Sequence, residues 1–391
     1  MTIKIAIIGA GPAGLYTANL LHDKNYDITI FEEHGFIGSN HCTGVISEST
    51  FRMLNVKREV TLNRVKSIVI TDLKNSIEFK LKDNVLVINR PKLEENLLSN
   101  IENNVHLRLN RKVLKIDSDG HVVTRDGIEK FDLIINAEGS KGIITKSIIP
   151  SWRYDYVYGL QCDCKIVKDH YLIPSSDDEV IVIFNHKLSR YFFSWIVPLG
   201  NGWFRVGLAD TEYTYPKLIK LLRILKPTEM RRFSGGKIIL GPSPKILGRR
   251  RVILLGDAAG QVKPFTGGGI AVLTLSSQIL CKVLNIVDAT DLEKVVNIYS
   301  RIYWKLYGNM EYIMNILMKI LYRNCNELIY NLLRVMNNSE VIVQDYDNHV
   351  EVIVSMLSRF RSLIKILTLI MCRFSDDIFI KHVQNIINEL N

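Results

Sequence analysis

The stretch IKIAIIGAGPAGLYTANLLHDKNYDITIFEE, residues 3–33, decides the fold. Residues 4–8 are a short, apolar and β-branched run, which is typical of a parallel strand buried on both faces. Helical spacing follows from Pro12 to Lys24, and YDITIFE has the character of a second strand. The stretch therefore predicts a strand–helix–strand unit, which is the core of a Rossmann-type α/β domain.

Three glycines, Gly9, Gly11 and Gly14, stand between the predicted strand and helix, which is the context that the GxGxxG fingerprint requires. They permit a tight turn, close approach of a pyrophosphate and packing of the helix on the sheet. Glu32 ends the second strand, where a carboxylate can accept hydrogen bonds from an adenosine ribose. Glu33 is the weaker candidate because strand alternation points it elsewhere. These residues predict dinucleotide binding.

A second motif distinguishes FAD from NAD. VILLGDAAG (252–260) and PFTGGGI (264–270) predict a buried strand followed by a helix entered through glycines. Together they resemble the distal signature of FAD enzymes of the aromatic-hydroxylase type. In that resemblance the aspartate, here Asp257, meets the ribityl chain of the flavin, and the glycine turn presents N–H groups to the pyrophosphate and the flavin ring. INRPKLEENL (88–97) matches the segment of these enzymes that places an arginine near the flavin.

This resemblance implies FAD as the cofactor. DLIINAEGS (132–140) matches the third strand of these enzymes, near the adenosine half. The residues expected at the cofactor are Gly9, Gly11, Ala13, Gly14, Glu32, Cys42, Thr43, Gly44, Arg90, Val113, Gly256, Asp257, Gly267, Gly268, Gly269 and Ile270.

Three motifs make the resemblance more specific: HCTG (41–44), YFFSWIVPLGNGWFRVGL (191–208) and GDAAGQVKPFTGGGI (256–270). In combination they resemble the geranylgeranyl reductase family, FAD enzymes that saturate isoprenoid double bonds. The similarity covers roughly residues 1–290. In that family a cysteine–glycine loop lies beside the isoalloxazine, and Cys42 falls on this motif. The family's mechanism implies hydride transfer from flavin N5 to one alkene carbon and protonation of the other.

The role of Cys42 stays open between donating that proton and shaping the flavin site, and His41 is treated as a bystander. An aromatic Y-x-W-x-F-P strand lines the lipid pocket of the family. Here Phe193 replaces its tyrosine and a valine its phenylalanine, while Tyr191 lies two residues earlier and could supply the missing hydroxyl. The expected substrate residues are Tyr191, Phe193, Trp195 and Pro198.

Two other functions share these motifs. A flavin monooxygenase would need NAD(P)H delivery and a pocket for a flavin hydroperoxide, and the chain carries no second GxGxxG, although some hydroxylases also lack one. A non-redox isoprenoid cyclase, or a lipid-binding module with a structural flavin, is the third alternative.

The lobes are expected to be interleaved along the chain. Residues 1–150 and 235–290 are assigned to a discontinuous FAD-binding domain of the aromatic-hydroxylase or glutathione-reductase-like class. Residues 151–234 are assigned to a substrate domain with an antiparallel sheet, in which Gly200-Asn201-Gly202 forms a hairpin corner. Residues 291–391 are predicted to be helical throughout, and the helix expected over 350–372 could line a lipid tunnel or lie on a bilayer. A further hairpin is predicted over 65–81.

The net charge is +10, and the basic excess lies in residues 1–290. This suits an anionic substrate, an acidic redox partner or an anionic membrane surface, and no nucleic-acid module is recognisable. The resemblance implies an isoprenoid lipid substrate and an electron donor such as ferredoxin or NAD(P)H. A signal peptide and a transmembrane run are both missing from the sequence, so a cytoplasmic protein is expected, with peripheral membrane association open.

The six cysteines make no CxxC pair and no zinc spacing. Cys162 and Cys164 alternate on one face of a predicted strand, which indicates packing rather than metal binding.

Overall fold

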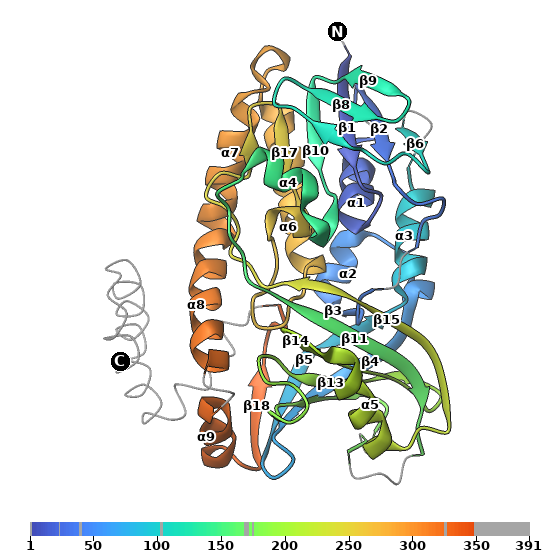
Figure 1. Ribbon diagram of the computed structural model, residues 1–391, viewed down its shortest axis with the longest axis vertical. Helices are drawn as coiled ribbons and strands as arrows, with labels where there is room; N and C mark the ends of the chain where they lie inside the picture. The colour runs from blue at the N-terminus through green and yellow to red at the C-terminus, as the bar shows by residue number, and fades with distance from the viewer. Residues whose placement is uncertain are drawn as a thin grey trace, which may run out of the picture.

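The computed structural model describes residues 2–22, 24–38, 41–101, 105–167, 172–173, 176–323 and 327–347. Their strands form three sheets, and the two larger ones lie one above the other in Figure 1. Two of the six cysteines, Cys325 and Cys372, and the helix predicted over 350–372 lie outside the described residues.

The upper sheet is the predicted Rossmann-type sheet. Its order is β16-β17-β10-β1-β2-β6, and all neighbours are parallel except β16 and β17. Its strands are β1 (Ile3–Ile8), β2 (Tyr26–Phe31), β6 (Val105–Arg108), β10 (Leu133–Asn136), β16 (Gly248–Arg249) and β17 (Val252–Leu254). The expected strand–helix–strand unit at the start of the chain is therefore confirmed.

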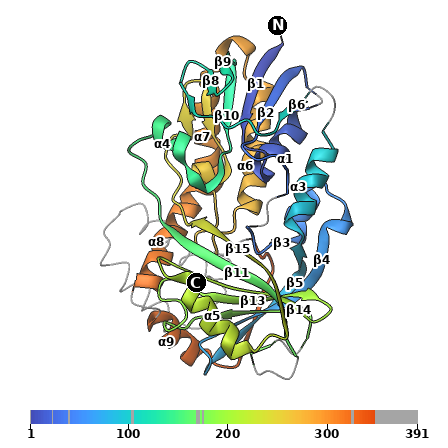
Figure 2. The ribbon, with the colours of Figure 1, turned by 45° about the vertical axis from the view of Figure 1, so that its right-hand side comes forward.

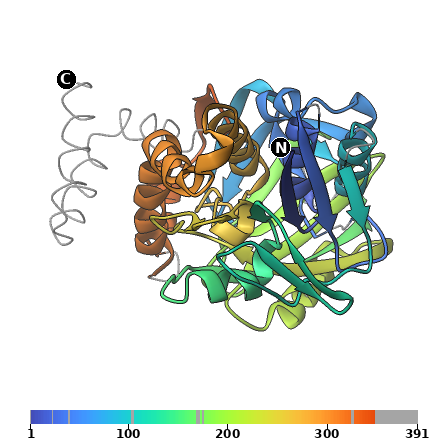
Figure 3. The same cartoon turned by 90° about the horizontal axis from the view of Figure 1, so that it is seen from above.

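Helices cover one face of this sheet, and a small sheet lies on the other. Against the first face pack α1 (Pro12–Leu21), α3 (Arg90–Ser99), α6 (Ile270–Ile286) and α7 (Lys294–Tyr303). On the second lie α4 (Ile143–Ile148) and the three strands β7 (Lys115–Ile116), β8 (His121–Thr124) and β9 (Gly127–Lys130). Viewed from above in Figure 3, the orange C-terminal helices run along one side of the upper sheet.

The lower sheet has nine strands in the order β15-β11-β14-β13-β12-β4-β5-β18, with β3 paired to β5. Their bounds are β3 (Val45–Ser47), β4 (Thr61–Thr71), β5 (Ser76–Ile88), β11 (Tyr156–Lys165), β12 (Glu179–Ile183), β13 (Ser194–Gly200), β14 (Trp203–Asp210), β15 (Glu229–Ile239) and β18 (Ser339–Val343). The turn at Gly200-Asn201-Gly202 joins β13 to β14, and all three residues have positive φ, as the hairpin prediction required.

The lower sheet departs from a purely antiparallel arrangement. β12 pairs in parallel with β4, and β18 pairs in parallel with β5. The predicted hairpin is present, but its second strand, β5, runs without interruption to Ile88. The sheet thus draws on segments before and after 151–234, while the domain boundaries themselves stay a prediction.

The two faces of the lower sheet are covered by different helices. α5 (Thr214–Leu225) packs on one face through Leu218, Leu221 and Leu222. α8 (Asn309–Arg323) and α9 (Glu327–Val335) cover the other face, and α8 follows α7 through a π-helical segment, Trp304–Gly308. Figure 2 shows β11 and β15 running across the junction between the upper and lower parts.

The expectation of a wholly helical C-terminal region was wrong at β18. Val341 and Val343 alternate with exposed residues along this segment and bury their side chains against the lower sheet. Period-two alternation over five residues is a strand signal, and the surrounding helical pattern obscured it. Among the described residues, no helix is both long and apolar enough to cross a membrane.

Candidate active site

One continuous cavity of about 1130 Å³ connects the two parts of the fold. Its upper part follows the carboxyl ends of β1, β2 and β10 to the start of α6, where an open α/β sheet places its ligands. Its lower part is an apolar chamber between the lower sheet and the pair α8 and α9. The chamber is walled by Ile68, Ile70, Ile77, Phe79, Val180, Val182, Phe193, Trp195, Leu321, Ile329 and Leu333.

The fingerprint glycines are required by close backbone contacts. Gly9 has φ +97°, and a Cβ on it would lie 2.5 Å from the carbonyl oxygen of Ala137. A Cβ on Gly14 would lie 2.0 Å from the carbonyl oxygen of Gly9. Gly11 precedes α1 and, with Ala13, lines the cavity, so the first turn of the helix presents its backbone N–H groups to the ligand.

Glu32 and Glu33 both line the cavity but have different partners. The Glu32 carboxylate accepts hydrogen bonds of 2.9 Å from the backbone N–H groups of Ala10 and His34. Glu33 forms ion pairs with Lys112 and Lys141, and the bond from Lys141 is the largest cause that lowers the pKa of Glu33. Since two lysines neutralise Glu33, Glu32 stays the predicted ribose acceptor. Buried Val113 lines this end of the cavity as well.

Arg90 and Asp257 both line the cavity. Arg90 forms an ion pair with Glu94, while its Nε is buried and has no hydrogen-bond partner among the described residues. Burial raises the pKa of Asp257, and the charge of Arg90 opposes this rise. The Oδ1 atom of Asp257 lies 2.9 Å from the place where a Cβ on Gly269 would stand. A donor without a partner and a buried carboxylate therefore line the same part of the cavity.

Helix α6 begins at this point without a side-chain cap. Gly269 is its N-cap residue, and the helix continues for 17 residues from Ile270. Gly267 has φ +65°, and a Cβ there would lie 2.1 Å from a side-chain atom of Ile238. Gly268 completes the turn. Gly256, at the end of β17, has φ +65° and faces Ala13. The unsatisfied N–H groups of α6 and its dipole favour an anionic group at this end.

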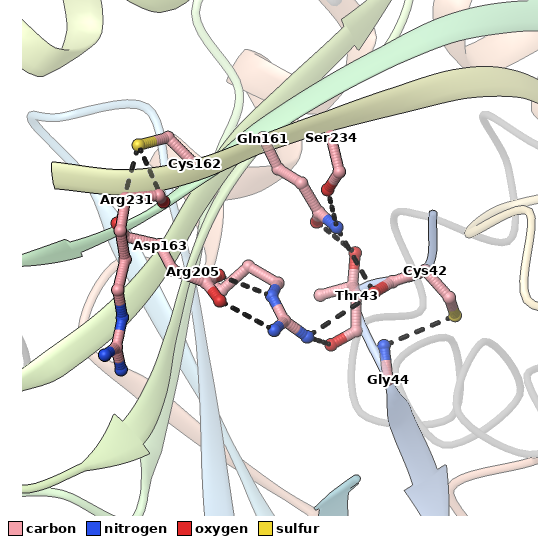
Figure 4. Close-up of polar contacts among 9 residues, drawn as sticks. All are labelled: Cys42, Thr43, Gly44, Gln161, Cys162, Asp163, Arg205, Arg231 and Ser234. Carbon is pink, nitrogen blue, oxygen red and sulfur yellow. Dashed lines mark hydrogen bonds and ion pairs between the residues drawn. The ribbon is translucent and has the colours of Figure 1, made fainter. Parts of the chain in front are cut away.

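Cys42 lines the cavity. Figure 4 shows its polar contacts with residues of the lower sheet. Its Sγ accepts a hydrogen bond of 3.3 Å from the backbone N–H of Gly44. Gln161 on β11 donates to the carbonyl of Cys42 at 3.2 Å, and the hydroxyl of Thr43 donates to Gln161 Oε1 at 3.2 Å. Gly44 has φ +82°, and a Cβ on it would lie 2.6 Å from the carbonyl oxygen of Ile88. The loop therefore passes close to the backbone of β5 at Gly44.

The aromatic strand contributes two of its four predicted residues to the chamber. Phe193 and Trp195 are buried and line it, and the rings of Phe192 and Phe193 stack at 4.2 Å. Pro198 is not among the lining residues, because strand alternation turns it to the opposite face from Trp195. Tyr191 is also outside the lining. Tyr191 precedes β13 and lies in a bend. Both Phe192 and Phe193 face the chamber there, so the side chains do not alternate as they do within a strand.

Comparisons with known proteins agree with this geometry. A family model described as pyridine nucleotide-disulphide oxidoreductase matches residues 3–151, and one described as squalene epoxidase matches residues 240–373. Geranylgeranyl diphosphate reductase of Synechocystis is 24% identical over 83% of this chain and 86% of its own length. Digeranylgeranylglycerophospholipid reductase 1 of Methanopyrus kandleri is 23% identical over 71% of this chain and 79% of its own.

The fold agrees as well. The solved structure of a geranylgeranyl bacteriochlorophyll reductase-like protein from Thermoplasma acidophilum superposes with a TM-score of 0.80, covering 94% of this chain and 98% of that one at 16% identity. The chain resembles geranylgeranyl reductases in sequence, and it shares the fold of the reductase-like protein. It is an FAD oxidoreductase, and the site fits FAD on its own contacts: a ribose acceptor at Glu32, an unpaired buried donor at Arg90 and the uncapped start of α6.

Sequence reasoning missed two buried ion pairs of this protein. Arg205 on β14 binds Asp163 on β11, and the same guanidinium reaches the Cys42 loop. Lys263 lines the cavity and binds Asp347, which follows β18. A charged residue in the middle of an apolar strand, as in WFRVGL, signals the first pair. Nothing in the sequence around Asp347 pointed to the second.

Proposed function

We propose that this protein is a reductase that saturates carbon–carbon double bonds of isoprenoid chains of the geranylgeranyl type, in archaeal-type membrane lipids or their precursors. One observation carries the proposal: the cofactor end of the cavity opens directly into a large apolar chamber, and Cys42 lines the same cavity. The names of the relatives support it.

The chamber suits a long hydrocarbon. Its walls are aliphatic and aromatic side chains from β4, β5, β12, β13, α8 and α9. Burial of apolar surface contributes roughly 25 cal/mol per Å², so an isoprenoid chain gains affinity along its whole length without specific polar contacts. An alkene is a poor electrophile, so the rate depends on holding it in a fixed position away from water.

Bound FAD supplies the hydride for one alkene carbon. The chain's own contribution is the proton for the other carbon, and we assign the donation of this proton to Cys42. Donation leaves a thiolate on Sγ, which the N–H of Gly44 already contacts at 3.3 Å. This hydrogen bond stabilises the negative charge that proton donation creates.

The partners follow from the same chemistry. The electron donor is of the ferredoxin or NAD(P)H type, and the basic excess in residues 1–290 suits an acidic carrier or an anionic bilayer surface. A cytoplasmic protein that takes its lipid from the inner leaflet fits this set of partners.

The test is anaerobic turnover of the FAD-loaded protein with a geranylgeranyl lipid and a low-potential chemical reductant. Mass spectrometry is expected to show a gain of two hydrogen atoms for each double bond saturated. Incorporation of oxygen from air with NAD(P)H would identify a monooxygenase instead. An unchanged lipid under both conditions, with bound FAD that the reductant does bleach, would support the non-redox alternative.

A further inference from the structure

Lys263 places a buried ammonium group over the glycine turn that begins α6. The residue is 4% exposed, and its backbone carbonyl accepts a bond of 2.8 Å from the N–H of Gly267. A Cβ on Gly268 would lie 2.9 Å from Cε and 3.7 Å from Nζ of Lys263. The ammonium group therefore lies beside the uncapped N-terminus of α6, and both face the cavity.

The ammonium has a single carboxylate partner at bonding distance among the described residues. Nζ of Lys263 lies 2.8 Å from Oδ1 of Asp347 and 4.3 Å from the ring centre of Tyr346. Asp347 is fixed in turn by the hydroxyls of Ser47 and Thr50, the latter at 2.7 Å. Burial alone would lower the pKa of Lys263, but Tyr346 and Asp347 outweigh it, so the lysine stays charged.

We propose that Lys263 raises the reduction potential of the bound FAD and that Asp347 limits this rise. Reduction of bound FAD to its anionic form would take two electrons from an external low-potential donor and one proton from water. A fixed positive charge beside the site favours the anion, and it acts strongly because the surroundings are buried. The dipole of α6 acts in the same direction.

Stability alone is a weak reason for this ion pair. A buried pair gains little net free energy over apolar side chains of similar size, because both charges must leave water. The ion pair lies against the glycine turn that faces the cavity. There the ammonium charge of Lys263 can act on a bound cofactor. The carboxylate of Asp347 comes from the C-terminal part of the chain, and the ammonium of Lys263 comes from the turn before α6. The net charge beside the turn therefore depends on two segments that are far apart in the sequence.

The inference rests on FAD binding and not on the lipid substrate, so its test uses no lipid. The midpoint potential of the purified holoprotein is measured by spectroelectrochemical titration with mediator dyes. Lys263→Met is expected to lower the reduced-to-oxidised ratio at a fixed ambient potential about tenfold, which for a two-electron couple is about 30 mV. Lys263→Arg, which keeps the charge, is expected to stay close to the wild-type potential.

Asp347→Asn is the matched variant, because it breaks the same ion pair but keeps the ammonium. It is expected to raise the potential. Shifts of opposite sign in Lys263→Met and Asp347→Asn support a charge effect, whereas shifts of the same sign, or an unchanged potential in Lys263→Met, overturn it. If Lys263→Met does not retain FAD, Asp347→Asn decides alone: a higher potential supports the proposal, and an unchanged or lower one overturns it.

Discussion

Arg205 and Asp163 form a buried bidentate ion pair, with Nε 2.7 Å from Oδ1 and Nη2 3.0 Å from Oδ2. The remaining nitrogen, Nη1, donates to the carbonyl oxygen of Thr43 at 2.9 Å and to that of Cys42 at 3.4 Å. The planar guanidinium thus binds a strand of the lower sheet and the Cys42 loop at the same time. The position of the Cys42 loop is therefore set by strands of the sheet that also walls the apolar chamber.

Arg205→Met is expected to destabilise the protein by about 3–5 kcal/mol, because it leaves the carboxylate of Asp163 buried without its partner. Chemical unfolding measures this loss, and alkene reduction is expected to fall with it. The double variant Arg205→Met/Asp163→Leu is the control. It should regain most of the stability but not the activity, since nothing then holds the Cys42 loop. Full activity in the double variant would show that the loop needs no such support.

Cys42→Ala is expected to retain FAD and to lose about 100-fold or more of alkene reduction, the size of effect typical of a missing general acid. The visible spectrum of the bound flavin checks retention, and product analysis checks turnover. Cys164→Ala is the matched control, because Cys164 is fully buried on the other face of the lower sheet. It should cost stability and leave turnover intact. Equal turnover in the two variants would reduce Cys42 to a packing role.

Val182→Phe is expected to shorten the isoprenoid that the protein accepts. Val182 on β12 lines the chamber and is registered with Ile70 on β4, so the larger ring fills space that a long chain needs. The ratio of kcat/KM for twenty-carbon over ten-carbon chains should fall at least tenfold. Val69→Phe adds the same volume on the opposite face of β4, among the residues that pack under α5. It should lower stability without changing chain-length preference, and an equal change in both variants would argue against the chamber as the lipid site.

Glu311 is expected to make folding stability depend on pH. It is fully buried, its carboxylate accepts bonds of 2.8 Å from the N–H and the hydroxyl of Ser243, and burial raises its pKa to about 8. The unfolded chain ionises near the ordinary value of 4.5, so the folded protein holds one more proton between these values. The free energy by which protonated Glu311 stabilises the folded protein is therefore fully present below pH 4.5 and is lost as the pH rises to about 8.

Unfolding free energies from pH 5 to 8 test this. Glu311→Gln should remove a decline of up to about 1.4 kcal/mol per pH unit, because glutamine does not ionise. If the unfolding free energies of wild type and variant changed with pH in parallel, the raised pKa of Glu311 would be contradicted.

The cofactor half of the site was predictable because its signals are local. Gly9, Gly14 and Glu32 stand at fixed spacings within one strand–helix–strand unit, and backbone sterics demand those glycines whatever the rest of the chain does. Asp257 and the α6 turn form a second unit of the same kind. FAD, the family and the α/β fold could all be inferred from such segments.

The remaining contacts of the site could not be predicted, because they depend on pairings between strands that are far apart in the sequence. Asp163 and Arg205 meet only because β11 and β14 are antiparallel neighbours in a register that no local pattern encodes. Asp347 reaches Lys263 only because β18 is inserted beside β5. Tyr191 was placed in the pocket by assuming regular alternation, which fails before β13, where two adjacent phenylalanines face the chamber. Pro198 was placed there by the family's aromatic motif, but strand alternation turns it away from the chamber.

The parallel pairing of β18 with β5 has a consequence for the order of assembly. Ser339 is registered with Ile77, so a strand near the end of the described chain completes a sheet begun near its start. During synthesis the elements around the cofactor, through α6 at Ile286, leave the ribosome well before residue 339. Long-range strand pairing is slow and leaves an open edge and apolar surface exposed meanwhile. The nascent protein therefore passes through a stage in which the apolar chamber is unfinished, and that stage is where a chaperone would matter most.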